Sequence, residues 1–153
     1  MRVSVRDITS DDLPTLFRYQ SDPESNQLAA VRPRDEQSFN RLWANAFHDP
    51  SITARAILAD DTLVGHISCF PLDGQPAIGY WIDRDYWGKG IASRALAIFL
   101  DLIPTRPLHA RAARHNVASL RVLQKCGFVI TGYQHSPATD RYLECEETLL
   151  VLI

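Results

Sequence analysis

A glycine-rich turn between a strand pattern and a helix pattern constrains the fold more than any other stretch of this sequence. In "AIGYWIDRDYWGKGIASRAL", residues 77–96, the first seven residues are typical of a strand, and apolar residues at helical spacing begin at Ile91. Between these patterns, Gly88 and Gly90 bracket Lys89. A tight turn that leads into a helix leaves free N–H groups at the helix N-terminus, and these favour negative charge. The sequence therefore predicts strands and helices in one fold, with an anion site at this turn.

The size and charge of the chain exclude several classes of protein. Its 153 residues, 46% of them hydrophobic, can build one compact core but hardly two, so a single domain over residues 1–153 is expected. The net charge is -2 and acidic and basic residues are interspersed, so nucleic acid is not an expected partner. No apolar run approaches the roughly 20 residues of a membrane span, and no membrane partner is expected.

The cysteines and the first residues indicate the compartment. Cys69, Cys126 and Cys145 have no metal-type spacing, so no metal site is expected. The start "MRVSVRDITSDD" lacks the apolar core of a signal peptide. The expected location is a reducing cytoplasm.

Hydrophobic periodicity predicts four helices around one sheet. The helices are expected from Ser10 onward and over about 34–49, 91–103 and 116–127. Strands are expected over about 3–8, 52–59, 62–70, 77–83, 107–112, 128–133 and 141–153. In the second helix one buried stripe is predicted, made of Phe39, Leu42, Trp43, Ala46 and Phe47. Asp60-Asp61 predicts a hairpin turn, and the whole pattern is typical of an α/β (α+β) fold.

The glycine turn does not match the two common phosphate-binding motifs. A P-loop has a Ser or Thr directly after its lysine, to hold magnesium, but Gly90 follows Lys89. A dinucleotide fingerprint has a third glycine where Ser93 stands. What remains is a strand, an open turn and a helix N-terminus, a combination that suits a diphosphate and requires no metal.

Two stretches together resemble a known family. "YWGKGIASRAL" and "RHNVASLRVLQKCGF" resemble the acyl-CoA-binding core of the GNAT superfamily of N-acyltransferases, in particular the branch of ribosomal-protein alanine N-acetyltransferases. The resemblance is closest over residues 62–133. It implies a GNAT-like domain with a central mixed, mostly antiparallel sheet, about four flanking helices and a V-shaped splay between the two central strands. The family's loop pattern, Arg/Gln-x-x-Gly-x-Gly/Ala, falls on residues 87–92, with Trp87 in place of the usual Arg or Gln.

The resemblance also implies a co-substrate, acetyl-CoA, and the residues that bind it. The diphosphate would meet the backbone of the glycine turn, and the pantetheine arm would pair with the end of the preceding strand. The implied binding residues are Trp81, Ile82, Trp87, Gly88, Lys89, Gly90, Ile91, Ala92, Ser93, Asn116 and Ser119. Each also has a purely structural interpretation. The glycines would simply make a turn, Lys89 would be a solvated charge, Asn116 a helix cap and Ser119 a surface hydroxyl.

Transfer to an amine requires a base, a donor to the carbonyl oxygen and an acid for the leaving thiolate. Many family members place a tyrosine acid where this chain has Leu123, so the resemblance points to Ser119 as the nearest catalytic replacement, and the backbone N–H near Ile82 would polarise the carbonyl. The candidate bases are His66, His109, His115, Tyr80 and Glu144. His109 and Arg111 alternate with alanines, so they share one sheet face, and one of them is expected to line the acceptor cleft. Cys126, in the last turn of a helix, is a poor nucleophile because the helix dipole disfavours a thiolate there, so direct transfer is expected.

The acceptor is expected to be a primary amine, either a protein N-terminal α-amine or a small-molecule amine. Without an evident strong base, a weakly basic amine is favoured. Two alternatives stay open: a CoA-binding module with weak or no catalysis, and an interaction protein whose glycine turn is only structural. The chain is expected to be a monomer or a homodimer.

Overall fold

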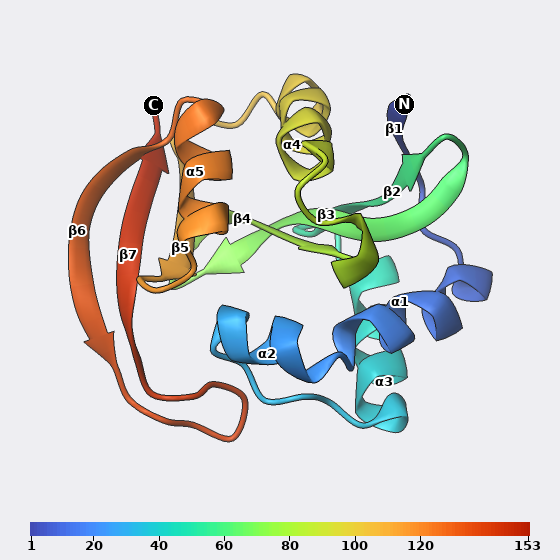
Figure 1. Ribbon diagram of the computed structural model, residues 1–153, viewed down its shortest axis with the longest axis horizontal. Coiled ribbons are helices and arrows are strands. Elements are labelled where there is room, and N and C mark those ends of the chain that lie inside the picture. Colours follow the sequence, from blue (N-terminus) through green and yellow to red (C-terminus); the bar gives the residue numbers. More distant parts are fainter.

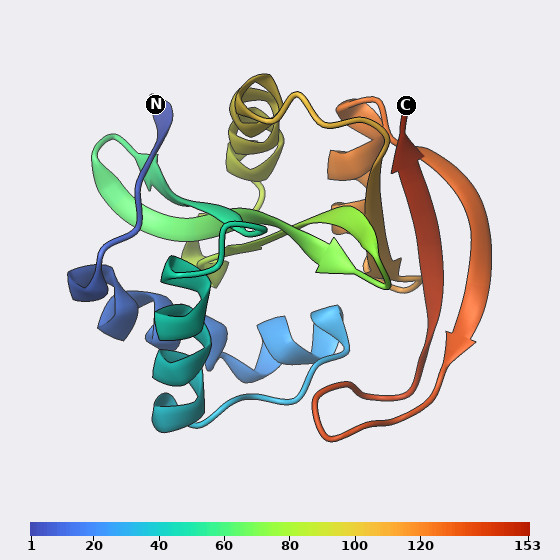
Figure 2. The ribbon, with the colours of Figure 1, turned by 180° about the vertical axis from the view of Figure 1, so that it is seen from behind.

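The computed structural model describes residues 1–153 and forms one twisted sheet with helices on both faces (Figure 1). The strands are β1 (Val3–Arg6), β2 (Thr53–Ala59), β3 (Thr62–Leu72), β4 (Gln75–Ile82), β5 (Leu108–Ala113), β6 (Val129–Ser136) and β7 (Cys145–Leu152). The helices are α1 (Leu13–Gln20), α2 (Pro23–Ala29), α3 (Glu36–Phe47), α4 (Ile91–Leu102) and α5 (Val117–Lys125), with short 3₁₀ turns η1 (Ser10–Asp12) and η2 (Arg84–Tyr86). Figure 2 shows from behind that α4 and α5 lie on one face and α1, α2 and α3 on the other.

The sheet confirms the predicted mixed, mostly antiparallel architecture. The strand order is β1-β2-β3-β4-β5-β7-β6, and every neighbouring pair is antiparallel except β4 and β5. These two central strands are parallel and share a single registered pair, Ala77 with His109. Beyond that pair they diverge, so the end of β4 carries backbone groups that no neighbouring strand uses. The V-shaped splay is therefore present.

The β2–β3 hairpin forms as predicted. Ala59 pairs with Thr62 across a two-residue turn. Asp60 and Asp61 occupy this turn with φ of 48° and 68°. Aspartate tolerates the left-handed region better than most residues, and two such residues in a row give the turn whose twist matches that of the strands.

The number of helices and the start of the first helix differ from the expectation. There are five α-helices, because α2 forms from "PESNQLA". Asp22 caps α2 by accepting a hydrogen bond from the Ser25 backbone N–H, and Pro23 occupies the first turn. These are ordinary start signals in the sequence. The first helix begins at Leu13, after the 3₁₀ turn, and not at Ser10.

The predicted buried stripe of α3 is only half correct. Phe39 and Trp43 are buried, but Leu42 and Phe47 are 41% and 43% exposed. The helix packs against α1, where the Phe39 and Phe17 ring centroids are 5.3 Å apart, and against β3, where the Trp43 ring meets the His66 ring edge-on. A helix that touches its neighbour along one edge buries a narrower stripe than one that lies across a sheet.

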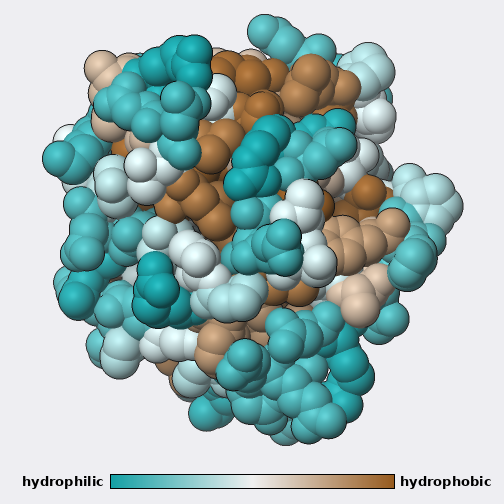
Figure 3. Space-filling model, turned by 90° about the vertical axis from the view of Figure 1, so that its right-hand side faces the viewer, coloured by the Kyte–Doolittle hydropathy of each residue, from teal (hydrophilic) through white to brown (hydrophobic).

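The main hydrophobic core lies between the sheet and the α4–α5 layer, and includes Ile67, Leu96, Phe99, Leu108 and Leu150. A smaller cluster joins α1 to α3. Figure 3 views the side that carries β1, α1 and α3. Apolar residues gather in its upper half, where β1 packs against α4, and its lower half is mostly polar. None of the helices has the length and apolar character that crossing a membrane requires.

Candidate functional site

A cavity of about 370 Å³ opens at the splay between β4 and β5. It is lined by α2, the end of β4, the glycine turn, the first turn of α4 and one side of α5. Of the eleven residues expected to bind acetyl-CoA, ten line it: Trp81, Ile82, Trp87, Gly88, Gly90, Ile91, Ala92, Ser93, Asn116 and Ser119. Lys89 is exposed and is not part of the lining.

The glycine turn has the conformation that an anion-binding loop requires. Gly88 and Gly90 have φ of 76° and 75°, a region that residues with a Cβ rarely adopt. Gly90 is the N-cap of α4, and no side chain caps this helix. The N–H groups of the first turn of α4 therefore have no intrahelical acceptor. The residues of this turn, Ile91, Ala92 and Ser93, line the cavity.

The end of β4 presents backbone donors to the splay. The Asp83 N–H donates to the Val64 carbonyl at 2.8 Å, which continues the β3–β4 ladder. Because bonding alternates along an antiparallel strand, the N–H groups of Tyr80 and Ile82 point away from β3 and toward the splay. The backbone of Trp81 is paired with that of His66, so its N–H group is not free for a ligand.

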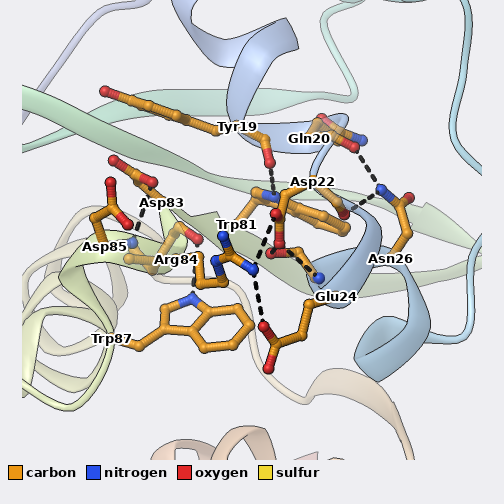
Figure 4. Close-up of polar contacts among 12 residues, drawn as sticks. Tyr19, Gln20, Asp22, Glu24, Asn26, Trp81, Asp83, Arg84, Asp85 and Trp87 are labelled. Atoms are coloured by element: carbon orange, nitrogen blue, oxygen red, sulfur yellow. Dashed lines mark hydrogen bonds and ion pairs between the residues drawn. The ribbon is translucent and has the colours of Figure 1, made fainter.

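Two tryptophans and an arginine hold this strand end in place (Figure 4). The indole of Trp81 donates to the Tyr19 carbonyl at 3.1 Å, and the indole of Trp87 donates to the Ile82 carbonyl at 3.0 Å. The Arg84 guanidinium lies 2.9 Å from a carboxylate oxygen of Glu24 on α2. These contacts link α1, α2 and β4, so the cavity wall is built from segments far apart in the sequence.

Ser119 and Tyr80 form the only hydroxyl pair in the cavity wall. Their oxygen atoms are 3.0 Å apart. The Ser119 N–H points to the Asn116 side chain, which caps α5 at 3.4 Å. Burial raises the pKa of Tyr80 to about 12, and the hydrogen bond with Ser119 opposes this shift only in part. Tyr80 therefore stays protonated at neutral pH, which makes it unsuitable as a base.

None of the other candidate bases lines the cavity. The ring nitrogens of His66 are buried without a partner, the ring packs edge-on against Trp43, and burial lowers the pKa of His66 to about 4. His115 lies 3.2 Å from the Gln27 carbonyl, and Glu144 pairs with His135 at 3.2 Å. His109 lies at the closed end of the splay, opposite Ala77.

The neighbouring Arg111 and Cys126 also lie outside the cavity. Arg111 forms an ion pair with Asp73, at 2.5 Å. The thiol of Cys126 lies 3.5 Å from the Ser93 carbonyl, and burial raises its pKa. A thiol that stays protonated is a poor nucleophile, which agrees with direct transfer.

The cavity also contains residues that the sequence did not single out. Ser25, Leu28 and Ala29 come from α2, the helix that periodicity missed. Arg121, two residues after Ser119 on α5, is a lining residue with a permanent positive charge. Its position within the motif "RHNVASLRVLQKCGF" is the one signal that would have pointed to it.

Comparison with known proteins gives a consistent result. The family model described as "Acetyltransferase (GNAT) domain" matches residues 2–129. An uncharacterized N-acetyltransferase, p20, of Bacillus licheniformis is 26% identical over 140 residues, which cover 83% of this chain and 79% of that protein.

Solved acetyltransferase structures share the fold. A spermidine N-acetyltransferase chimera from Vibrio cholerae and hSSAT superposes with a TM-score of 0.84 at 16% identity, covering 100% of this chain and 96% of that one. A ribosomal-protein-S5-alanine acetyltransferase from Vibrio fischeri superposes with a TM-score of 0.75 at 22% identity. The superposition covers 100% of this chain and 93% of that one.

Proposed function

Because the chain belongs to the GNAT family of acetyltransferases, it is an acyltransferase, and we propose that it transfers the acetyl group of acetyl-CoA directly to a primary α-amine. One observation carries the proposal most strongly. A single cavity joins an uncapped helix N-terminus, free N–H groups at the end of a strand, and a pair of hydroxyl groups. These three features suit, in turn, a diphosphate, an amide-rich arm and a leaving thiolate.

The residues of the cavity fit acetyl-CoA. The backbone of residues 88–93 would bind the diphosphate, with Arg121 adding positive charge nearby. The Tyr80 N–H would pair with the pantetheine arm as an added strand does, which leaves the Ile82 N–H for the thioester. When bound, acetyl-CoA supplies an activated acyl group as a thioester, and no metal is needed.

In the proposed mechanism the chain orients the reactants and moves one proton. The Ile82 N–H donates to the thioester carbonyl oxygen, where negative charge develops. The amine nitrogen bonds to the acyl carbon, and the carbon–sulfur bond breaks. Ser119 passes the proton lost by the amine to the departing thiolate. Tyr80, whose pKa of about 12 lies far above that of a thiol, stays protonated and orients Ser119 by a hydrogen bond.

The composition of the cavity wall favours an α-amine acceptor. The lining residues include no histidine, aspartate or glutamate, so no side chain there is suited to deprotonate an ammonium group. An α-amino group with a pKa near 8 is about 10% neutral at pH 7, and a lysine amine with a pKa near 10.4 is neutral at only a few parts in ten thousand. The difference is a factor of several hundred in reactive amine.

This acceptor preference is directly testable. At pH 7, peptides with a free N-terminus and no lysine should be acetylated at least a hundredfold faster than N-blocked peptides that contain lysine. The measurement is a competition assay read by mass spectrometry, with release of the CoA thiol as a second readout. Faster acetylation of the lysine peptides would contradict the proposal. Binding of acetyl-CoA without thiol release on any amine would instead support a binding module.

The diphosphate site is tested by Gly90→Val. Valine at φ 75° is strained, and its methyl groups would fill the open space beside the turn, where only Arg94 lies within 4 Å. We expect the affinity for acetyl-CoA, measured by calorimetry, to fall at least tenfold. Gly74→Val is the matched control, because Gly74 has φ of 78°, equally open surroundings and no place in the cavity. Equal affinities in the two folded variants would remove the turn from the binding site.

A further inference from the structure

Three arginines gather without a carboxylate partner where the segment after α2 meets the β6–β7 connection. They are Arg32, Arg34 and Arg141, and none of them is in an ion pair. Five of the other arginines each pair with an aspartate or glutamate: Arg2, Arg6, Arg55, Arg84 and Arg111. Arg32, Arg34 and Arg141 together are called the arginine cluster.

Backbone pairing holds the arginine cluster together. Val31 and Tyr142 form an antiparallel bridge. The Arg32 N–H donates to the Arg141 carbonyl at 2.7 Å, and the Leu143 N–H donates to the Ala30 carbonyl at 2.9 Å. In Figures 1 and 2 the β6–β7 connection accordingly lies beside the segment that joins α2 to α3. The arginines are thus brought together by the fold, although they are up to 109 residues apart.

The guanidinium groups of the cluster are not fully hydrogen-bonded within the protein. The Arg32 Nε donates to the Thr139 carbonyl at 2.9 Å, and the Arg141 guanidinium donates to the Arg32 carbonyl. The Nε of Arg34 is buried and has no hydrogen-bond partner. Burial lowers the pKa of Arg141, and the positive charge of Arg34 lowers it further. Partly buried like charges without a counter-ion are unfavourable, and an anion would relieve both the repulsion and the missing hydrogen bond.

The carboxylates nearest in the sequence do not neutralise the cluster. Asp35 caps α3 by accepting from the Ser38 N–H at 2.7 Å. Glu144 is engaged by His135, and Asp140 is in no ion pair. The cluster therefore remains available to an anion from outside the chain.

The cluster follows α2 in the chain, and the end of α2 lines the cavity, although none of the three arginines does. Leu28 and Ala29, at the end of α2, line the cavity, and the cluster begins three residues later in the chain at Arg32. The α2 helix covers the sheet face opposite to α4, whose N-terminus is the anion site of the glycine turn (Figure 1). A group held by the cluster therefore approaches the splay from the side opposite to that of the diphosphate.

We propose that the arginine cluster binds acidic side chains of the acceptor, so that the preferred substrate is a peptide with aspartate or glutamate close to its free N-terminus. This inference rests on the proposed α-amine acetylation. Arginine suits the role because its planar guanidinium binds a carboxylate through two parallel hydrogen bonds. The same charges repel a polycation, so a polyamine is a poor acceptor at this site.

The test uses three peptides that have a free N-terminus and differ only in residues 2–4, which are acidic, neutral or basic. The full-length protein should show a KM for the acidic peptide at least tenfold below that for the basic one. In Arg34→Gln the ratio of the KM for the basic peptide to the KM for the acidic peptide should fall about tenfold. The values of kcat and of the KM for acetyl-CoA should not change. Arg34→Lys keeps the charge but loses the planar guanidinium. Its preference for the acidic peptide should lie between those of the unaltered protein and Arg34→Gln. Arg41→Gln is the matched control, because Arg41 is an exposed arginine on α3 that is not part of the cluster.

The outcomes separate this inference from the function on which it rests. If no peptide α-amine is acetylated, the proposed acceptor class is wrong. If all three peptides are acetylated alike by the unaltered protein, or if Arg34→Gln keeps the full preference while its melting temperature is unchanged, the cluster is not an acceptor site. A rise in the KM for acetyl-CoA would assign the cluster to the co-substrate and overturn the inference.

Discussion

Replacement of Ser119 by alanine should lower kcat by about a hundredfold, the lower end of what a positioned proton-transfer group contributes. Ser119 is the hydroxyl proposed to carry the proton from the amine to the thiolate. Tyr80 holds it across a distance of 3.0 Å. Tyr80→Phe should therefore change kcat in the same direction, and the double variant should be little slower than Ser119→Ala, because the two groups act as a unit.

The measurement is steady-state release of the CoA thiol, with acetyl-CoA affinity determined separately. Tyr133→Phe is the control, because Tyr133 lies on β6, is half exposed and has no part in the cavity. Equal turnover in Ser119→Ala and the unaltered protein would exclude Ser119 from catalysis. Independent effects of Ser119→Ala and Tyr80→Phe would show that the hydroxyl pair does not work as one relay.

Gly65→Ala should be the most destabilising single change at the splay. A Cβ at Gly65 would lie 2.0 Å from the Trp81 carbonyl oxygen, a backbone atom that moves only if β4 shifts away from β3. Gly65 pairs with Ile82, at the strand end whose N–H groups line the cavity. Overpacking of this kind costs up to about 3 kcal/mol, which corresponds to roughly 10 °C in melting temperature for a chain of this size. Acetyl-CoA affinity should fall as well.

Gly132→Ala provides the matched comparison. Gly132 also lies in a strand, β6, but nothing is within 4 Å of the position that its Cβ would occupy. Its free energy of unfolding should change by no more than about 0.5 kcal/mol. Similar unfolding free energies for the two alanine variants, measured by denaturant titration, would show that β3 and β4 do not approach as closely as described.

The features that the sequence predicted correctly are those that a few adjacent residues determine. The β2–β3 hairpin follows from Asp60-Asp61, the start of α4 from the glycine turn, and the cap of α5 from Asn116. Each depends on the conformational preference or hydrogen bonding of adjacent residues. The α2 helix carries the same kind of signal in Asp22-Pro23, so its start is also set by adjacent residues.

Features that depend on distant segments were settled by the tertiary structure alone. The burial of Phe39 and the exposure of Leu42 depend on which edge of α3 meets α1, since both residues fit the same helical period. Tyr80 contacts Ser119, 39 residues away, because β4 and α5 border the same cavity. The arginine cluster exists because the segment after α2 pairs with the β6–β7 connection. Local preference and periodicity determine elements, whereas the packing of the sheet between two helical layers determines which side chains meet.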